Sequence, residues 1–218
     1  GEPTAAQWAD AWGALLDLAP RAAAVRAFRF DVVDLGREVL SAHFRDSLAD
    51  LKAATEAWNE AAAWRAAASM LEAVDDLDML LSTDENFILG RWLAWARAWG
   101  GSEEEKAWLE FNARNQLTLW GPTGQINDYA SKAWGGLVRT YYKPRWVVFF
   151  KHLFHAMASG PAWKFNQTAF DTEVMQEVEL PWQTASGGVP AAPQGDTVAV
   201  ARALLGKYGS AGAGRLRP

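Results

Sequence analysis

The segment "LTLWGPTGQINDYA", residues 117–130, interrupts a chain in which most other stretches have the apolar spacing of amphipathic helices. Loops in helical bundles are usually short and polar, but this one contains a tryptophan, two glycines, a proline and a tyrosine. Gly121 and Pro122 predict a sharp turn at the end of a helix. We expect that turn to place the Trp120 indole, Ile126 and the Tyr129 phenol at one end of a helical bundle.

An indole and a phenol at a helix end allow two interpretations. They can stack on a pyranose ring and bond its hydroxyl groups, which is how many sugar pockets are lined. They can also fill the interior of a packed turn between two helices. On physical grounds alone the packed turn is favoured, so the segment by itself does not assign a function.

The sequence on both sides of this segment predicts helices. Apolar residues recur at spacings of three to five from Val32 to Leu51, which indicates a helix of more than five turns. Ser102 followed by Glu105 forms a capping box at another helix start, and Asp128 is a candidate cap for a helix over residues 129–142. Other helices are expected over residues 4–19, 53–81 with an optional break near 58–61, 87–99, 144–157, 169–182 and 197–208.

The predicted fold is an all-α helical bundle domain with no sheet of its own, because we find no strand-like alternation. We expect a helical lead-in over residues 1–27 and the main domain over 28–184. A Pro/Gly-rich linker and a closing helix of the same domain follow at 185–208. Residues 209–218 are expected to form a flexible tail.

Composition excludes several classes of function. Half of the 218 residues are hydrophobic and the formal charge is −5, which argues against a general nucleic-acid binder. The longest apolar run, "WVVFF" at residues 146–150, is too short to span a membrane, and no signal peptide is visible. The absence of cysteine excludes disulfides and thiolate chemistry.

The candidates for chemistry elsewhere in the chain all have ordinary structural explanations. His152 and His155 have helical spacing but no third metal ligand, and the acidic clusters at 103–105 and 75–78 lack a calcium-loop pattern. We assign the first cluster to helix N-terminal charge preference and the second to a solvated face. The basic "RTYYKPRW" at 139–146 could grip an anion, but helix-end charges around Pro144 are favoured. We find no self-sufficient catalytic motif and expect neither a metal nor a cofactor.

The triplet "NQT" at residues 166–168 makes Asn166 a candidate N-glycosylation site. Such triplets also occur by chance in cytosolic chains, so this one alone is weak evidence for a secretory protein.

A longer run resembles a known family. The stretch "NQLTLWGPTGQINDYASKAWGGLVRTYYKPRW", residues 115–146, is similar to the C-terminal helical domain of the α-N-acetylglucosaminidases, glycoside hydrolase family 89. Segments 28–40, 87–97 and 195–208 also resemble it, so the similarity covers about residues 28–208. Gln125, Asn127, Ala113 and Arg114 depart from the family pattern, which puts fine specificity in doubt. The matching positions are Asn112, 116–121, 128–130, Gly136, Leu137 and 141–146.

The resemblance implies part of a retaining glycosidase that removes terminal α-linked N-acetylglucosamine from glycans such as heparan sulfate, in a lysosomal or secreted setting. It implies that the two catalytic glutamates lie on a barrel portion outside this chain, which makes that portion the partner. By the same resemblance Trp120, Ile126 and Tyr129 help to line the pocket for the terminal sugar. We therefore expect no catalytic residue here and no activity of the isolated chain; a homo-oligomer is compatible with the sequence.

An alternative stays open at this point. The chain could be a non-catalytic helical module, descended from that domain and used for scaffolding or docking in a larger assembly. In that case we expect no barrel partner, and we expect neighbouring residues to close over the surface around Trp120.

Overall fold

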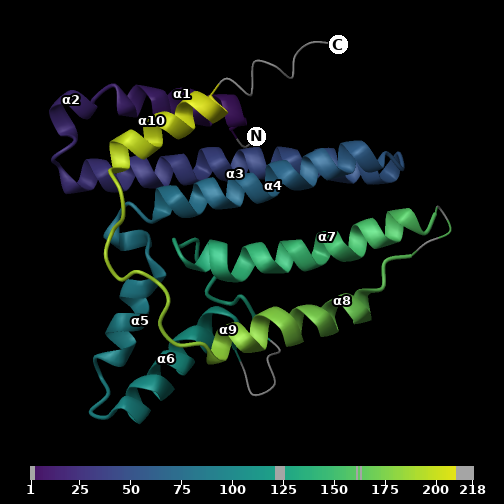
Figure 1. The fold of residues 1–218 in the computed structure, drawn as a ribbon. Helices are drawn as coiled ribbons and strands as arrows, with labels where there is room; N and C mark the ends of the chain where they lie inside the picture. The colour runs from purple at the N-terminus through teal and green to yellow at the C-terminus, as the bar shows by residue number, and fades with distance from the viewer. Residues whose placement is uncertain (1–2, 121–125, 161, 163, 210–218) are drawn as a thin grey trace. The chain divides into compact units, whose positions relative to one another are not determined.

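The computed structural model describes residues 3–120, 126–160, 162 and 164–209, without the side chains of Ile126 and Asn127. These residues form helices with one short ladder of two strands, which confirms the all-α fold class (Figure 1). The chain divides into two compact units, residues 1–87 with 193–218 and residues 88–192. Within the described ranges, no helix is both long and apolar enough to cross a bilayer.

The first unit is built on two long helices, α3 and α4, which lie side by side (Figure 1). Trp58, with φ of 55°, ends the first of them, and Asn59 caps the second by accepting from the backbone N–H of Ala62 at 3.0 Å. The optional break in the predicted helix over 53–81 is therefore real. The elements of this unit are α1 (Ala5–Leu16), α2 (Ala19–Ala22), α3 (Arg26–Glu56), α4 (Glu60–Leu81), η1 (Glu85–Phe87) and α10 (Thr197–Tyr208).

A buried tryptophan fixes the distance between α1 and α3. The Trp12 indole N–H donates to the Val32 carbonyl at 2.8 Å, and its ring lies against Gly36. A Cβ at Gly36 would come within 2.4 Å of this ring and 2.6 Å of the Leu80 side chain. Glycine is required here because the helices approach too closely for any side chain.

The closing helix α10 belongs to the first unit. Asp196 caps it, as its sequence predicted, by accepting from the backbone N–H of Ala199 at 2.7 Å. At the other end the Tyr208 hydroxyl donates to the Asp76 carboxylate at 2.6 Å. Thr197 also donates to the Thr83 carbonyl at 3.4 Å, so both ends of α10 are bonded to the region of α4.

The second unit contains the segment on which the functional prediction rests. The predicted Ser102–Glu105 capping box is present at the start of α6, and Pro144 lies in the first turn of α7. The elements are α5 (Leu89–Arg97), α6 (Glu103–Leu117), β1 (Leu119–Trp120), β2 (Ile126–Asn127), the π-helical turn η2 (Val138–Tyr142), α7 (Lys143–Ala158), α8 (Gln167–Val174), the π-helical turn η3 (Met175–Glu179) and α9 (Leu180–Thr184).

The predicted helix over residues 129–142 is wrong in its first half. Asp128, Ser131 and Gly136 have φ of 54°, 45° and 87°, in the left-handed region that a right-handed helix cannot include. Helical backbone therefore begins only at Leu137, after a β-bridge between Ile88 and Gly135. Asp128 does not act as a helix cap, because its carboxylate pairs with Arg145.

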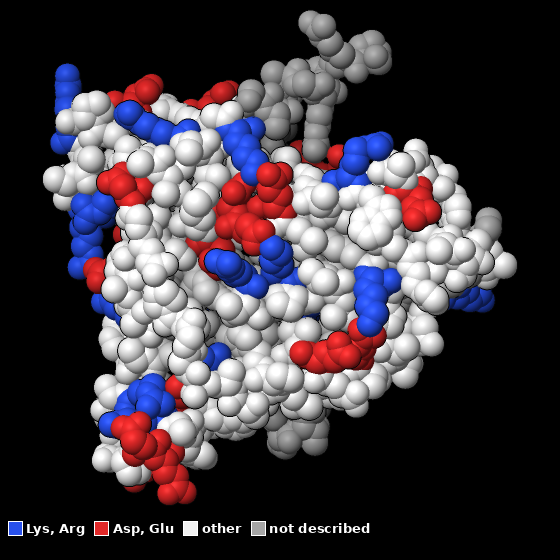
Figure 2. Space-filling model, viewed as in Figure 1, with Lys and Arg blue, Asp and Glu red and all other residues white. Residues whose placement is uncertain are grey.

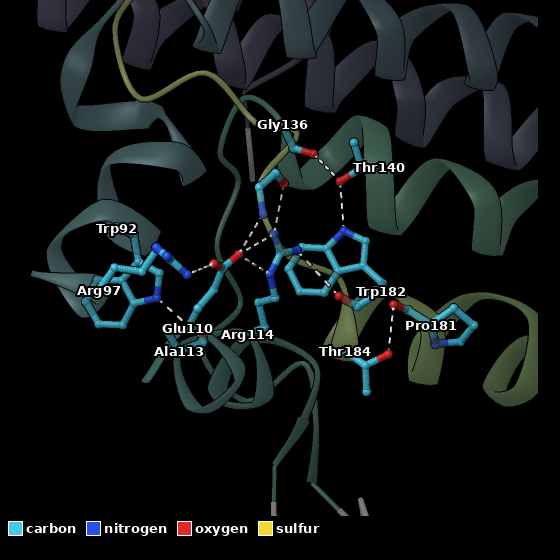
Figure 3. Close-up of polar contacts among 11 residues, drawn as sticks. Trp92, Arg97, Glu110, Ala113, Arg114, Gly136, Thr140, Pro181, Trp182 and Thr184 are labelled. Carbon is cyan, nitrogen blue, oxygen red and sulfur yellow. Dashed lines mark hydrogen bonds and ion pairs between the residues drawn. The ribbon is translucent and has the colours of Figure 1, made fainter. Parts of the chain in front are cut away.

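A buried ion pair on α6 holds the second unit together (Figure 3). Arg114 and Glu110 are 1% and 2% exposed, and the Arg114 Nε and Nη2 donate to Glu110 Oε1 at 3.0 and 2.9 Å. The other carboxylate oxygen, Oε2, accepts from Arg97 of α5 at 3.2 Å. A buried carboxylate with this many donors is well satisfied, which offsets much of its desolvation cost.

The same ion pair also fixes α9 and the chain after it (Figure 3). Arg114 donates to the carbonyls of Trp182 and Gly187 at 3.4 and 3.3 Å, and its guanidinium lies 4.7 Å from the Trp182 ring centroid. In return the Gly187 N–H donates to Glu110 Oε1 at 3.2 Å. Three elements, α5, α6 and α9, are thus held by the side chains of Arg114 and Glu110. These two residues lie four and eight positions before Thr118 in the sequence.

We predict that Glu110→Gln destabilises the chain by about 3–5 kcal/mol, because it leaves the buried Arg114 charge without its counter-ion. Urea unfolding followed by circular dichroism measures this loss. Glu103→Gln is the matched control, since it removes an exposed carboxylate that binds the same Arg97. A loss no larger for Glu110→Gln than for this control would contradict the structural role of the pair.

Candidate functional site

The β1–β2 ladder brings the predicted site residues together. In its antiparallel register Trp120 lies opposite Ile126, and Leu119 lies opposite Asn127. The ladder is extended by the Asp128 N–H, which donates to the Thr118 carbonyl at 2.9 Å. Trp120, Ile126 and Tyr129 therefore lie close together in the fold.

Trp120 and Tyr129 form an aromatic pair with open surface, which we call the aromatic corner. Their ring centroids are 4.6 Å apart at an interplanar angle of 56°, a favourable tilted arrangement. The residues are 39% and 66% exposed. The contact between the two rings therefore leaves a substantial part of both accessible to solvent. If the rings filled the interior of a packed turn, they would be buried.

Part of the predicted turn lies outside the described residues. This holds for Gly121, Pro122 and Gly124, and for Gln125, one of the departures from the family pattern. Ile126 is placed by its backbone alone. The expected sharp turn, and the contact of the Ile126 side chain with a sugar, stay predictions.

A charged cluster includes Asp128, the residue before Tyr129 in the sequence. Arg145 donates from Nη1 to Asp128 Oδ2 at 2.5 Å, and its Nε is 3.1 Å from Glu179 Oε1. The Tyr141 hydroxyl donates to the same Glu179 oxygen at 3.5 Å. One arginine thus links the residue before Tyr129 to η3, and the guanidinium also lies 5.1 Å from the Tyr141 ring centroid.

Burial dominates the protonation behaviour of this cluster. It raises the pKa of Glu179 above the usual range of a glutamate, although the neighbouring Arg145 acts in the opposite direction. It also raises the pKa of Tyr142 to about 12 and the pKa of Tyr141 further. Both phenols are therefore protonated at neutral pH, and neither is poised as a base.

Sequence reasoning missed the role of this cluster. It offered Asp128 as a helix cap and Arg145 as part of an anion grip or a helix end, and it did not single out Glu179. The Asp128–Arg145 contact joins positions 17 residues apart, and the intervening chain is only partly helical. No local spacing rule indicates such a pair, because it depends on the left-handed turn at Asp128.

The remaining sequence candidates have ordinary structural surroundings. His152 bonds Glu173 at 2.9 Å and His155 is exposed; no group of three or more potential metal-ligating His, Cys, Asp or Glu side chains occurs among the residues the structure describes. The solvated face predicted for residues 75–78 is wrong for Asp78, which is buried. It lies four residues after the buried Val74 on the inner face of α4.

On the face shown in Figure 2, the described residues form no concentrated basic area that could bind an anion. Basic and acidic side chains lie next to one another on the face shown in Figure 2, and wide neutral areas separate these groups. The pairs Lys151–Glu173 and Lys207–Asp76 are examples of this mixing. Arg145 of "RTYYKPRW" is already engaged by two carboxylates.

Known proteins that are similar to this chain belong to one family. The family model of the alpha-N-acetylglucosaminidase (NAGLU) C-terminal domain matches residues 4–207. The human protein named alpha-N-acetylglucosaminidase is 39% identical over 200 residues, which are 91% of this chain and 26% of the human protein.

Solved structures of family 89 glycoside hydrolase from Clostridium perfringens share the fold. One, in complex with 2-acetamido-1,2-dideoxynojirmycin, has a TM-score of 0.80 at 21% identity, and the match covers 94% of this chain and 24% of that one. Another, in complex with its substrate GlcNAc-alpha-1,4-galactose, has a TM-score of 0.82 at 21% identity, covering 98% and 25%.

The chain spans about a quarter of the length of these relatives. The family model, in contrast, covers almost the whole chain. The chain therefore belongs to the family of alpha-N-acetylglucosaminidase C-terminal domains.

Proposed function

We propose that this domain forms part of the pocket wall of a retaining glycoside hydrolase that releases terminal α-linked N-acetylglucosamine from glycans such as heparan sulfate. The observation that carries the proposal is the aromatic corner. Two tilted rings are both substantially exposed, and the backbone of one of them, Trp120, pairs with that of Ile126. Family membership indicates the reaction, and the aromatic corner indicates which part of that reaction this chain assists.

The corner suits a sugar ring for chemical reasons. A pyranose presents C–H groups on its faces and hydroxyls around its edge, so it can stack on an indole while a phenol bonds an edge hydroxyl. The angle of 56° between the rings gives two surfaces that meet the sugar from different directions. Walls of this kind hold the reacting sugar in place and exclude water, which assists catalysis without proton transfer.

The carboxylates near the corner are not suited to the chemistry of retention. That reaction needs two carboxyl groups roughly 5 Å apart, one as nucleophile and one as acid/base. Asp128 and Glu179 both bind the Arg145 guanidinium, and Glu179 is almost fully buried. We therefore place both catalytic carboxyl groups on the barrel portion of the complete protein, outside this chain.

We predict that the isolated 218-residue chain does not hydrolyse an aryl α-N-acetylglucosaminide, whereas the complete polypeptide does. Release of the aryl leaving group, followed by absorbance with equal molar amounts of each protein, measures the difference. Turnover by the isolated chain would show that catalytic carboxyl groups lie within it, contrary to the proposal.

In the complete polypeptide, Trp120→Ala should lower kcat/KM by about 10- to 200-fold, the range for losing an apolar contact with the substrate. Trp99→Ala is the matched control, since Trp99 is 86% exposed and lies on the segment after α5. Thermal unfolding should show the same midpoint for both variants. An unchanged kcat/KM for Trp120→Ala would show that Trp120 does not line the pocket. That result would favour the alternative role as a non-catalytic scaffold or docking module.

We further propose a lysosomal or secreted location with an N-glycan on Asn166. This residue is exposed, and it caps α8 by accepting from the Ala169 N–H at 3.1 Å through Oδ1. Glycosylation modifies the other side-chain atom, Nδ2, so the cap and the glycan are compatible.

On expression through a eukaryotic secretory pathway, we predict that the chain loses apparent mass when treated with an N-glycosidase. Thr168→Ala should abolish this shift while keeping the Asn166 cap, and Asn166→Gln should abolish both. A shift that persists in Thr168→Ala would place the glycan elsewhere. No shift in the unaltered chain would contradict the proposed modification.

A further inference from the structure

We propose that the Asp128–Arg145 ion pair positions Tyr129 in the pocket wall, so that Arg145 acts on the sugar through Asp128 without touching it. This inference rests on the proposed function, because it assigns a task to residues that support the aromatic corner. It concerns positioning residues, and the chemistry of the reaction stays with the barrel portion.

The backbone around Tyr129 has little regular structure to hold it. Residues 128–130 form a turn and residues 131–134 have no regular secondary structure, with left-handed φ at Asp128 and Ser131. Non-glycine residues adopt such conformations only where their surroundings impose them. Two backbone hydrogen bonds contribute, from the Asp128 N–H to Thr118 and from the Ser131 N–H to the Asp128 carbonyl, both at 2.9 Å. Asp128 takes part in both of them, so its placement sets that of Tyr129.

The side chain of Asp128 is fixed by one charged contact. Its Oδ2 accepts from Arg145 at 2.5 Å, whereas its Oδ1 is buried and has no hydrogen-bond partner among the residues described. A partly buried carboxylate depends strongly on its counter-ion. The contact with Arg145 is therefore the one that decides where this carboxylate lies.

Arg145 is itself held by the core of the second unit. Glu179, which is 2% exposed, binds its Nε, and the guanidinium lies over the ring of the fully buried Tyr141. Tyr141 in turn belongs to the cluster of buried residues around Leu137 and Trp182. Arg145 thus connects a rigid core on one side with the residue before Tyr129 on the other, as a positioning residue must.

A double-mutant cycle in the complete polypeptide tests this inference. Asp128→Gly removes the carboxylate without backbone strain, since glycine accepts a φ of 54°. We expect it to lower kcat/KM by roughly 10-fold or more, because small misplacements of a wall are costly. Asp128→Asn should restore most of the activity, since it keeps an acceptor for Arg145 and also tolerates left-handed φ.

The decisive comparison is with Tyr129→Ala. If Asp128 acts through Tyr129, then Asp128→Gly combined with Tyr129→Ala should match Tyr129→Ala alone to within about twofold in kcat/KM. Arg145→Met should lower kcat/KM by the same factor as Asp128→Gly. If Arg145→Met does not fold, the Asp128 variants alone test the inference. Glu173→Gln, which breaks the separate Lys151 pair on α8, is the control and should leave kcat/KM unchanged.

The outcomes separate this inference from the proposed function. Suppose that Tyr129→Ala lowers kcat/KM. If Asp128→Gly then has no effect on kcat/KM, or lowers it in the double variant by its full separate factor, the positioning role is overturned but the pocket-wall proposal stands. If neither Trp120→Ala nor Tyr129→Ala changes kcat/KM, the pocket wall is overturned, and the positioning role with it.

Discussion

The second unit depends on a guanidinium, that of Arg114, buried between three helices with its carboxylate partner Glu110. Removing either charge would leave the other without compensation in a region of low polarity, so the two side chains hold α5, α6 and α9 in one arrangement. The Thr118 hydroxyl donates to the Arg114 carbonyl at 2.9 Å, one turn further along the chain. The ion pair thus fixes the point from which β1 and Trp120 begin.

The second flank of the ladder is held by the same kind of interaction. Arg145 joins Asp128, just after β2, to the buried Glu179. The chain next to Trp120 and the chain next to Tyr129 are therefore each bonded to an arginine that pairs with an almost fully buried glutamate. Such support explains how two rings that are 39% and 66% exposed can keep a defined position, which a pocket wall needs in order to orient a substrate.

The sequence was sufficient for what depends on local patterning. Apolar spacing and caps such as Ser102 and Asp196 predicted the helices, and the family motif placed Trp120 and Tyr129 together. It was insufficient for Arg114, which looked like a departure from the family pattern and is a centre of the core. It also misplaced the helix start after Asp128. Both depend on contacts between distant parts of the chain, which no helical period encodes.

The central claim is that this domain touches the sugar through the aromatic corner. A crystal structure of the complete polypeptide with a bound N-acetylglucosamine-type inhibitor tests it most directly. The account predicts that the rings of Trp120 and Tyr129 both lie within about 4 Å of the bound sugar. A sugar bound in the barrel with no atom of either ring within that distance would contradict it.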